Sequence, residues 1–154
     1  MTIEKIYWDS DAFLGHLQNE PGKANLCQGT LIRANKEEVL IVTSTLTPAE
    51  VLWMRNAPRI TADKANIVKR FFRRSYIRLY NVTRSISEYA QELVWSHNVK
   101  PKDAIHVATA LQLQVDALET FDEGLIALSG KLGNPPLVIR KPQQPKQGEL
   151  DFDS

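Results

Sequence analysis

The chain of 154 residues is 43% hydrophobic and 24% charged, which is enough for one hydrophobic core and short for two domains. The single cysteine, Cys27, excludes an internal disulfide and has no CxxC partner for a structural zinc. The opening MTIEKIYWDS lacks the features of a signal peptide, and no stretch approaches the roughly 18 apolar residues of a membrane span. These observations predict a cytoplasmic protein without a membrane segment.

Strand and helix patterns alternate along the chain, as is typical of an α/β sandwich with a mostly parallel central sheet. Branched and aromatic residues predict strands at 4–8, 39–44, 76–82, 117–121 and 136–141, of which VLIVTS at 39–44 is the clearest. Apolar periodicity and turn signals predict helices from 9 or 10 to the Pro21-Gly22 break, over 23–35, from 47, from 61 or 62 to 74, from 85 or 87 to 97, from 101 to 114 and over 123–130.

Capping signals precede several of these helices. Asp9 or Ser10 can cap the first helix, and Ser85 or Ser87 can cap the helix that ends near residue 97. The sequence TPAE at 47–50 has the pattern of a capping box with proline at the first helical position. We therefore expect a helix to start at each of these points.

The folded domain is expected to cover residues 1–141. From residue 142 the sequence PQQPKQGELDFDS continues as a polar segment rich in Gln and Pro, so 142–154 is predicted to be a disordered tail.

Positive charge is concentrated in one part of the chain. Residues 53–84 contain nine Lys and Arg against Asp63 alone, so this window carries +8 while the whole chain carries +1 and the remainder −7. Such a division can attract a polyanion to one face and cations to another.

Four carboxylates occupy positions where a strand or loop should change into a helix: Asp9, Glu50, Asp103 and Asp122. The carboxyl ends of parallel strands face one crevice, so residues far apart in sequence can gather there. Two like charges ~4 Å apart at an effective dielectric near 20 repel by about 4 kcal/mol, a cost that a divalent cation removes. Oxygen ligands favour Mg²⁺ or Mn²⁺, which makes metal-dependent phosphodiester chemistry the leading hypothesis.

The order of these motifs resembles the PIN domain, a nuclease fold. The matching segments are a strand ending in Asp9-Ser10, TSTLTPAEV with Glu50, DAIHVATAL with Asp103, and Thr120-Phe121-Asp122 after a short strand. The resemblance covers about residues 4 to 140 and implies a three-layer α/β/α sandwich. Proteins of this size in the family look most like VapC-type toxins, so it also implies a Mg²⁺-dependent endoribonuclease that cleaves RNA, a homodimer and a cognate antitoxin protein.

The resemblance also implies roles for the acids. Asp9 and Asp103 are the best direct metal ligands, while Glu50 and Asp122 would bind through waters, orient the attacking water or hold a second ion. Asp11 departs from the family's usual Asn, Ser or Thr and could serve as an outer ligand. The structural alternative for each acid is a helix cap, and it is strongest for Glu50 because the capping box alone explains it.

Three further residues are candidates for supporting roles. Ser10 and Thr120 could place a hydroxyl on an acid or a phosphate, although such residues often satisfy backbone groups instead. His106 lies one helical turn after Asp103 and could bond to an acid of the site. A partly buried histidine satisfied by the backbone is the more common alternative.

The basic segment KANIVKRFFRR suggests a surface for RNA phosphates, with a solvated helix face as the alternative. Its helix is expected to direct Ile67, Val68, Phe71 and Phe72 inward. The cations that would contact RNA are Lys69, Arg70, Arg73 and Arg74. Trp53 and Met54 could form a dimer or antitoxin surface, or pack in the core.

Two other functions compete with the ribonuclease. Asp9 and Asp11 form the Asp-x-Asp arrangement of haloacid-dehalogenase-type phosphatases, but Ala12-Phe13 replaces the hydroxyl residue that usually follows the second Asp. A catalytically silent RNA- or protein-binding module with the same fold is the other alternative, and the presence of all four acids argues against it.

Overall fold

Five strands form one sheet in the order β3-β2-β1-β4-β5, and every neighbouring pair is parallel. The computed structural model describes residues 2–51 and 61–143. The strands are β1 (Glu4–Trp8), β2 (Val39–Ser44), β3 (Ile77–Tyr80), β4 (Ala117–Glu119) and β5 (Ile139–Arg140). The helices are α1 (Ser10–Leu17), α2 (Ala24–Asn35), α3 (Thr47–Val51), α4 (Ala62–Phe72), α5 (Arg84–His97), α6 (Pro101–Leu113) and α7 (Glu123–Ile126).

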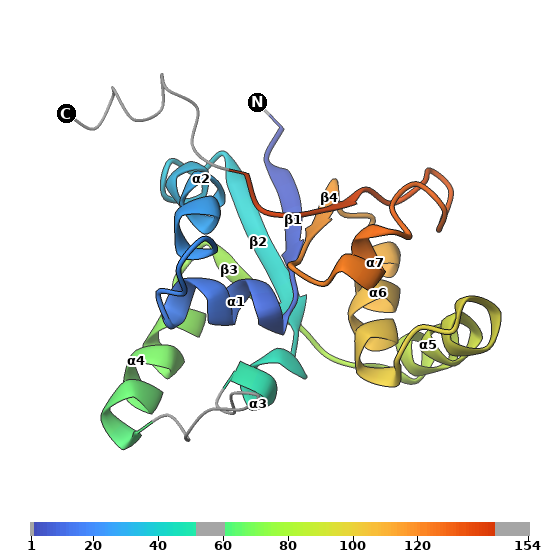
Figure 1. Ribbon diagram of the computed structural model, residues 1–154, viewed down its shortest axis with the longest axis horizontal. Coiled ribbons are helices and arrows are strands. Elements are labelled where there is room, and N and C mark those ends of the chain that lie inside the picture. The colour runs from blue at the N-terminus through green and yellow to red at the C-terminus, as the bar shows by residue number, and fades with distance from the viewer. Residues whose placement is uncertain (1, 52–60, 144–154) are drawn as a thin grey trace.

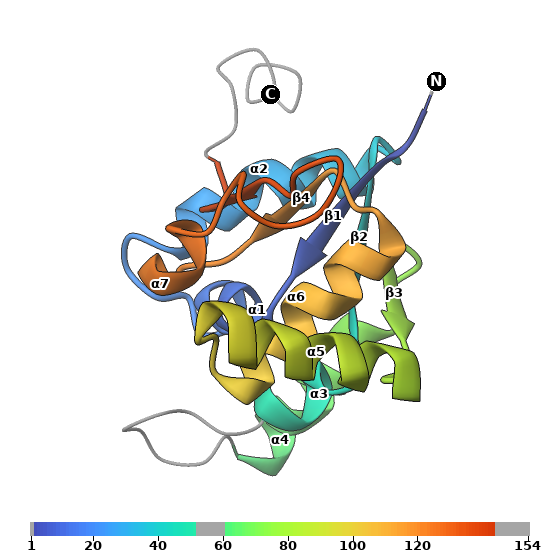
Figure 2. The ribbon, with the colours of Figure 1, turned by 90° about the vertical axis from the view of Figure 1, so that its right-hand side faces the viewer.

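The helices cover both faces of the sheet, which confirms the predicted α/β/α sandwich (Figure 1). Alternate side chains of β1 point to opposite faces. Ile6 and Trp8 pack with residues of α1, α2 and α4 such as Phe13, whereas Tyr7 belongs to a second cluster with residues of α5 and α6. Figure 2 shows α5 lying against α6 on the second face. The sheet therefore separates two hydrophobic cores.

The register of the central strands determines where the site can form. Tyr7 lies opposite Val42 of β2 and Leu118 of β4, and Trp8 lies opposite Glu119. Because the three strands are parallel and in step, their carboxyl ends reach the same edge of the sheet. The residues that follow these strands are thus brought together at that edge.

Several boundaries differ from the sequence prediction. Strands β3, β4 and β5 are shorter than predicted, and α4 ends at Phe72. The cap of α5 is Thr83, whose hydroxyl accepts a hydrogen bond from the Ile86 amide at 3.2 Å, and not Ser85 or Ser87. All three hydroxyl residues suit a helix start, so residue type alone does not select among them.

Helix α4 is only partly oriented as expected. Val68, Phe71 and Phe72 are buried, but Ile67 is 52% exposed, so its predicted inward orientation was wrong. Ile67 lies four residues before Phe71, so helical periodicity alone assigns it to the inward stripe, and its exposure shows that the buried stripe is narrower than this pattern predicts.

Some predictions fall outside the described residues. These are the roles of Trp53 and Met54, the cations at 55 and 59, and the tail from residue 144 onward. Among the helices of the described ranges, none combines the length and the apolar character needed to cross a membrane.

Candidate active site

The four predicted acids lie at the carboxyl edge of the central strands. Asp9 follows β1 and caps α1, Glu50 lies in α3 after β2, and Asp122 follows β4 and caps α7. Asp103 lies in the first turn of α6 on the second face of the sheet. Asp9 and Asp122, which are 113 positions apart in the sequence, thus lie at the same edge of the sheet.

Asp9 is both a helix cap and a member of the acid group. Its side chain is only 2% exposed, and its Oδ1 accepts a hydrogen bond from the Ala12 amide at 3.1 Å. Its Oδ2 accepts a hydrogen bond from the Thr120 hydroxyl. Burial raises the pKa of Asp9 to about 7, with His106 opposing that rise and Asp11 adding to it. The capping role and the proposed ligand role are therefore compatible in one carboxylate.

Asp103 and Asp122 are electrostatically coupled. Burial raises the pKa of Asp103 above its ordinary value, and the negative charges of Asp122, Asp11 and Glu50 raise it further. Asp122 accepts a hydrogen bond from the Leu125 amide at 3.1 Å, and its own amide donates to Thr120 at 3.1 Å. The carboxylates thus oppose one another's ionisation, which is the property expected of a group that shares one cation.

Glu50 is held by side chains of two other elements. The Ser10 hydroxyl donates to Oε1 at 2.5 Å, and His106 Nε2 lies 2.7 Å from the same oxygen. Burial acts to raise the pKa of Glu50, but the hydrogen bonds from His106 and Ser10 outweigh it and hold this pKa below its ordinary value. The Thr47 hydroxyl pairs with Thr43 at 2.6 Å. Within the described residues, the Glu50 side chain is hydrogen-bonded to Ser10 of α1 and His106 of α6.

His106 is fully enclosed and bonded to side chains. Its exposed fraction is 1%, its Nδ1 lies 2.7 Å from the Tyr7 hydroxyl, and its Nε2 approaches Glu50 and, at 3.3 Å, Ser10. The interpretation of a histidine satisfied by backbone groups was wrong. Tyr7 was not predicted as a site residue, although a phenol within a buried strand signals a hydroxyl that needs a buried partner.

A second buried carboxylate, Glu119 at the end of β4, was also missed. It accepts hydrogen bonds from Trp8 Nε1 at 2.9 Å and from the Thr30 hydroxyl at 2.6 Å, and it pairs with Arg140 at 3.4 Å. The signal was an acidic residue inside the apolar strand ALETF. Through these contacts, Glu119 of β4 links β1, α2 and β5.

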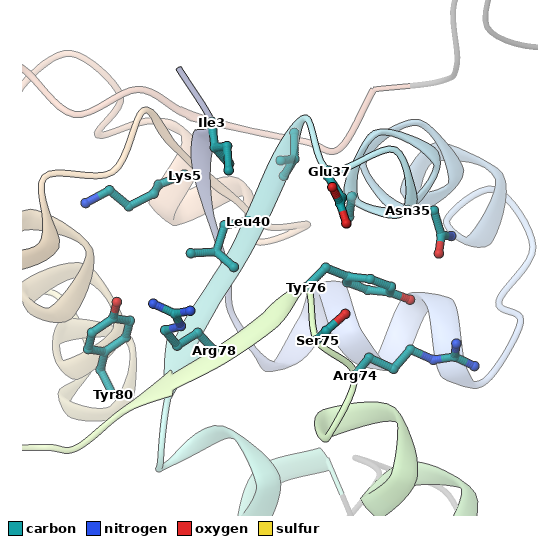
Figure 3. Close-up of a pocket in the computed structure, with 12 residues that line it drawn as sticks. Ile3, Lys5, Asn35, Glu37, Leu40, Arg74, Ser75, Tyr76, Arg78 and Tyr80 are labelled. Atoms are coloured by element: carbon teal, nitrogen blue, oxygen red, sulfur yellow. The ribbon is translucent and has the colours of Figure 1, made fainter. Parts of the chain in front are cut away.

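The four basic candidates lie away from the acids. Lys69, Arg70, Arg73 and Arg74 are exposed at the end of α4 and just after it. The Arg74 guanidinium lies 5.8 Å from the centre of the Phe71 ring. Arg74 also lines a cavity of about 760 Å³ with Lys5 and Arg78, drawn in Figure 3. This cavity is lined by residues of β1, β2, β3 and the end of α2, so it is separate from the acid edge.

The acids fit a hard divalent cation in the chemistry of their donors. They supply only carboxylate oxygens, and burial together with the charge of neighbouring acids raises the pKa values of Asp9 and Asp103, an effect that a bound cation would offset. Within residues 2–51 and 61–143, no group of three or more His, Cys, Asp or Glu side chains is arranged so that it could hold a metal ion.

Comparisons with known proteins agree on the fold. No curated protein matches the sequence. The structure is similar to VapC20 of Mycobacterium tuberculosis, described as a toxin that cleaves the sarcin-ricin loop, with 19% identity, a TM-score of 0.62 and coverage of 79% of this chain and 94% of that chain. It is also similar to a chain of a toxin–antitoxin complex from Klebsiella pneumoniae, with 18% identity, a TM-score of 0.62 and coverage of 90% and 98%.

A third similar structure is VapBC2 from Rickettsia felis bound to a DNA fragment from its promoter, with 13% identity, a TM-score of 0.65 and coverage of 89% of this chain and 98% of that chain. The profile of the PIN domain family matches residues 6–131. That match extends over more than half of the sequence and includes all four acids, so the chain belongs to the PIN domain family.

Proposed function

We propose that this protein is a metal-dependent endoribonuclease that hydrolyses RNA phosphodiester bonds and acts as the toxin of a type II toxin–antitoxin pair. The observation that carries the proposal is the group of four acids at one edge of the sheet, in which Asp103 is charge-coupled to Glu50 and Asp122. Membership in a family of nucleases and the similarity of the fold to toxin–antitoxin proteins support the same proposal.

Each acid has a distinct part in the proposed reaction. Asp9 and Asp103 would hold Mg²⁺ or Mn²⁺ directly, with Asp122 beside them and Asp11 as an outer ligand. When bound, the cation supplies a more acidic water and stabilises negative charge on the phosphate. Glu50, ionised and held by Ser10, would orient the attacking water at the crevice.

The Thr120 hydroxyl and the basic side chains at the end of α4 would support the reaction without binding the cation. Thr120 fixes Asp9 and the start of the Asp122 segment. The cations of α4 would track RNA phosphates, and they are Lys69, Arg70, Arg73 and Arg74. An antitoxin protein and a second copy of the chain are the proposed partners.

The test is cleavage of an RNA oligonucleotide in Mg²⁺, in Mn²⁺ and in chelator. Asp9→Asn and Asp103→Asn should each abolish metal-dependent cleavage, because they remove ligand charge with little change in volume. Glu92→Gln, on the exposed side of α5, is the control and should cleave like the wild type. Cleavage by either Asn variant at the wild-type rate would refute the site.

Growth of a bacterial host tests the toxin role. Expression of the wild-type chain alone should arrest growth, and expression of Asp103→Asn should not, since the arrest follows from cleavage. Equal arrest by both would point to a binding mechanism.

A further inference from the structure

A buried chain of hydrogen bonds connects β1 to the acid edge. The Tyr7 hydroxyl is 2.7 Å from His106 Nδ1, and His106 Nε2 is 2.7 Å from Glu50 Oε1. Tyr7 is fully buried and the His106 side chain is 2% exposed. The two rings meet edge to face, with centres 5.7 Å apart. Tyr7 lies in β1 and His106 in α6, so the row of hydrogen bonds forms only when α6 packs against the sheet.

The direction of the hydrogen bonds follows from the chemistry of Tyr7. At neutral pH a phenol keeps its proton, so the Tyr7 hydroxyl can donate to His106 Nδ1, 2.7 Å away. A neutral imidazole that accepts at Nδ1 carries its hydrogen on Nε2, and that hydrogen then points at Glu50.

The other tautomer would not support the site. It would place the Nε2 lone pair 2.7 Å from a carboxylate oxygen, which is a repulsive contact. With the hydrogen on Nε2, Oε1 of Glu50 accepts from both His106 and Ser10. Partners that fix the tautomer and ring of a histidine in this way are known to control the groups that the histidine orients.

We propose that Tyr7 and His106 are positioning residues that fix the Glu50 carboxylate in one orientation at the acid edge, with Tyr7 acting through the tautomer of His106. This inference rests on the proposed ribonuclease function, because Glu50 has its role there. Tyr7 and His106 are both buried, so they would act on the reaction only through Glu50. Simple core packing does not explain the arrangement, since apolar side chains would fill the same space without burying a phenol, an imidazole and a carboxylate.

Substitutions at both positions separate positioning from packing. Tyr7→Phe removes one oxygen and keeps the ring, and it should lower kcat for RNA cleavage about 10-fold, the usual effect of losing such a partner. KM should stay near its wild-type value because RNA contacts are unchanged. Tyr89→Phe on α5 removes the hydroxyl of a half-buried tyrosine that is not bonded to His106, and it should leave kcat unchanged.

The double variant is the sharper test. The Gln side chain in His106→Gln can present an N–H near the position of Nε2 and has no tautomers, so it should retain more activity than His106→Leu. Adding Tyr7→Phe to His106→Gln should then have no further effect on kcat. An equal loss from Tyr7→Phe in both backgrounds would overturn the proposal, as would a Tyr7→Phe rate within twofold of wild type.

A measurement without RNA distinguishes this inference from the proposed function. In the ¹⁵N spectrum of wild-type protein, the His106 ring should show the tautomer with hydrogen on Nε2, and Tyr7→Phe should give a mixture of tautomers. Hydrogen on Nδ1 in the wild type would refute the inference even if Tyr7→Phe fails to fold. An absence of RNA cleavage with the expected tautomer would instead remove the proposed function and leave the Tyr7–His106–Glu50 geometry established.

Discussion

Replacing Asp9 with Asn should change how stability depends on pH in the absence of metal. Asp9 keeps its proton up to about pH 7 in the folded protein, whereas its ordinary pKa is 3.8. Between these values the folded chain binds a proton that the unfolded chain has released. The free energy of unfolding of the wild type therefore falls as pH rises from about 4 to about 7. The Asn variant cannot bind this proton, so its free energy of unfolding does not fall with pH for this reason.

The magnitude follows from the two pKa values. At about 1.4 kcal/mol for each pH unit between 3.8 and about 7, the wild type should lose about 4 kcal/mol relative to Asp9→Asn. Asp9 is buried, so solvent screening does not reduce this figure in the way it would at the surface. Asn is as good a helix cap as Asp, so α1 should start normally in the variant. The altered hydrogen bond to Thr120 costs about 1 kcal/mol at every pH and cancels in the comparison.

Urea unfolding in chelator at pH values from 4 to 8 measures the effect. The difference in unfolding free energy between Asp9→Asn and wild type should grow in favour of the variant as pH rises. Asp63→Asn, in the exposed first turn of α4, is the control and should give a difference that changes by less than about 0.5 kcal/mol. If the difference for Asp9→Asn changed with pH as little as the difference for Asp63→Asn, the assignment of a raised pKa to the Asp9 carboxyl would be refuted.

Two further predictions concern the buried and the exposed charges. Glu119→Ala should lower the free energy of unfolding by about 3 kcal/mol, because Trp8 and Thr30 lose a buried acceptor, and Thr30→Val should cost only about 1 kcal/mol; equal losses in urea unfolding would contradict this. Neutralising the four basic residues at the end of α4 should flatten the salt dependence of RNA binding by about 0.7 in log K against log salt for each phosphate contact, close to 3 in total. Fluorescence anisotropy at several salt concentrations checks the slope, Lys131→Gln serves as the control, and an unchanged slope would move the RNA path to another surface. The four basic residues are Lys69, Arg70, Arg73 and Arg74.

The parallel sheet and the gathering of the acids could be predicted because both depend on local signals. The strand at 39–44 was predicted with its observed bounds, and the four acids follow capping and strand-end patterns that act over a few residues. Parallel topology then fixes the edge at which they gather. The family match also argues against the phosphatase suggested by Asp9 and Asp11.

Contacts between distant elements could not be predicted in the same way. The bond between Trp8 and Glu119 joins residues 111 positions apart, and that between Tyr7 and His106 joins residues 99 positions apart. Whether such side chains meet depends on the rotation of α6 against the sheet and on strand register, which hydrophobic periodicity defines only to within a residue or two. The same limit explains the error at Ile67.

Asp9 and Asp122 are helix caps as well as proposed metal ligands, and this affects the choice of an inactive variant for trapping RNA or isolating an antitoxin. Removing either side chain with Ala would also take away the acceptor that starts α1 or α7, so a loss of binding could come from a frayed helix beside the crevice. Asp103 lies inside the first turn of α6, where Lys100 occupies the cap position. Asp103→Asn is therefore the substitution that should abolish the proposed cleavage while keeping the partner-binding surface closest to that of the native protein.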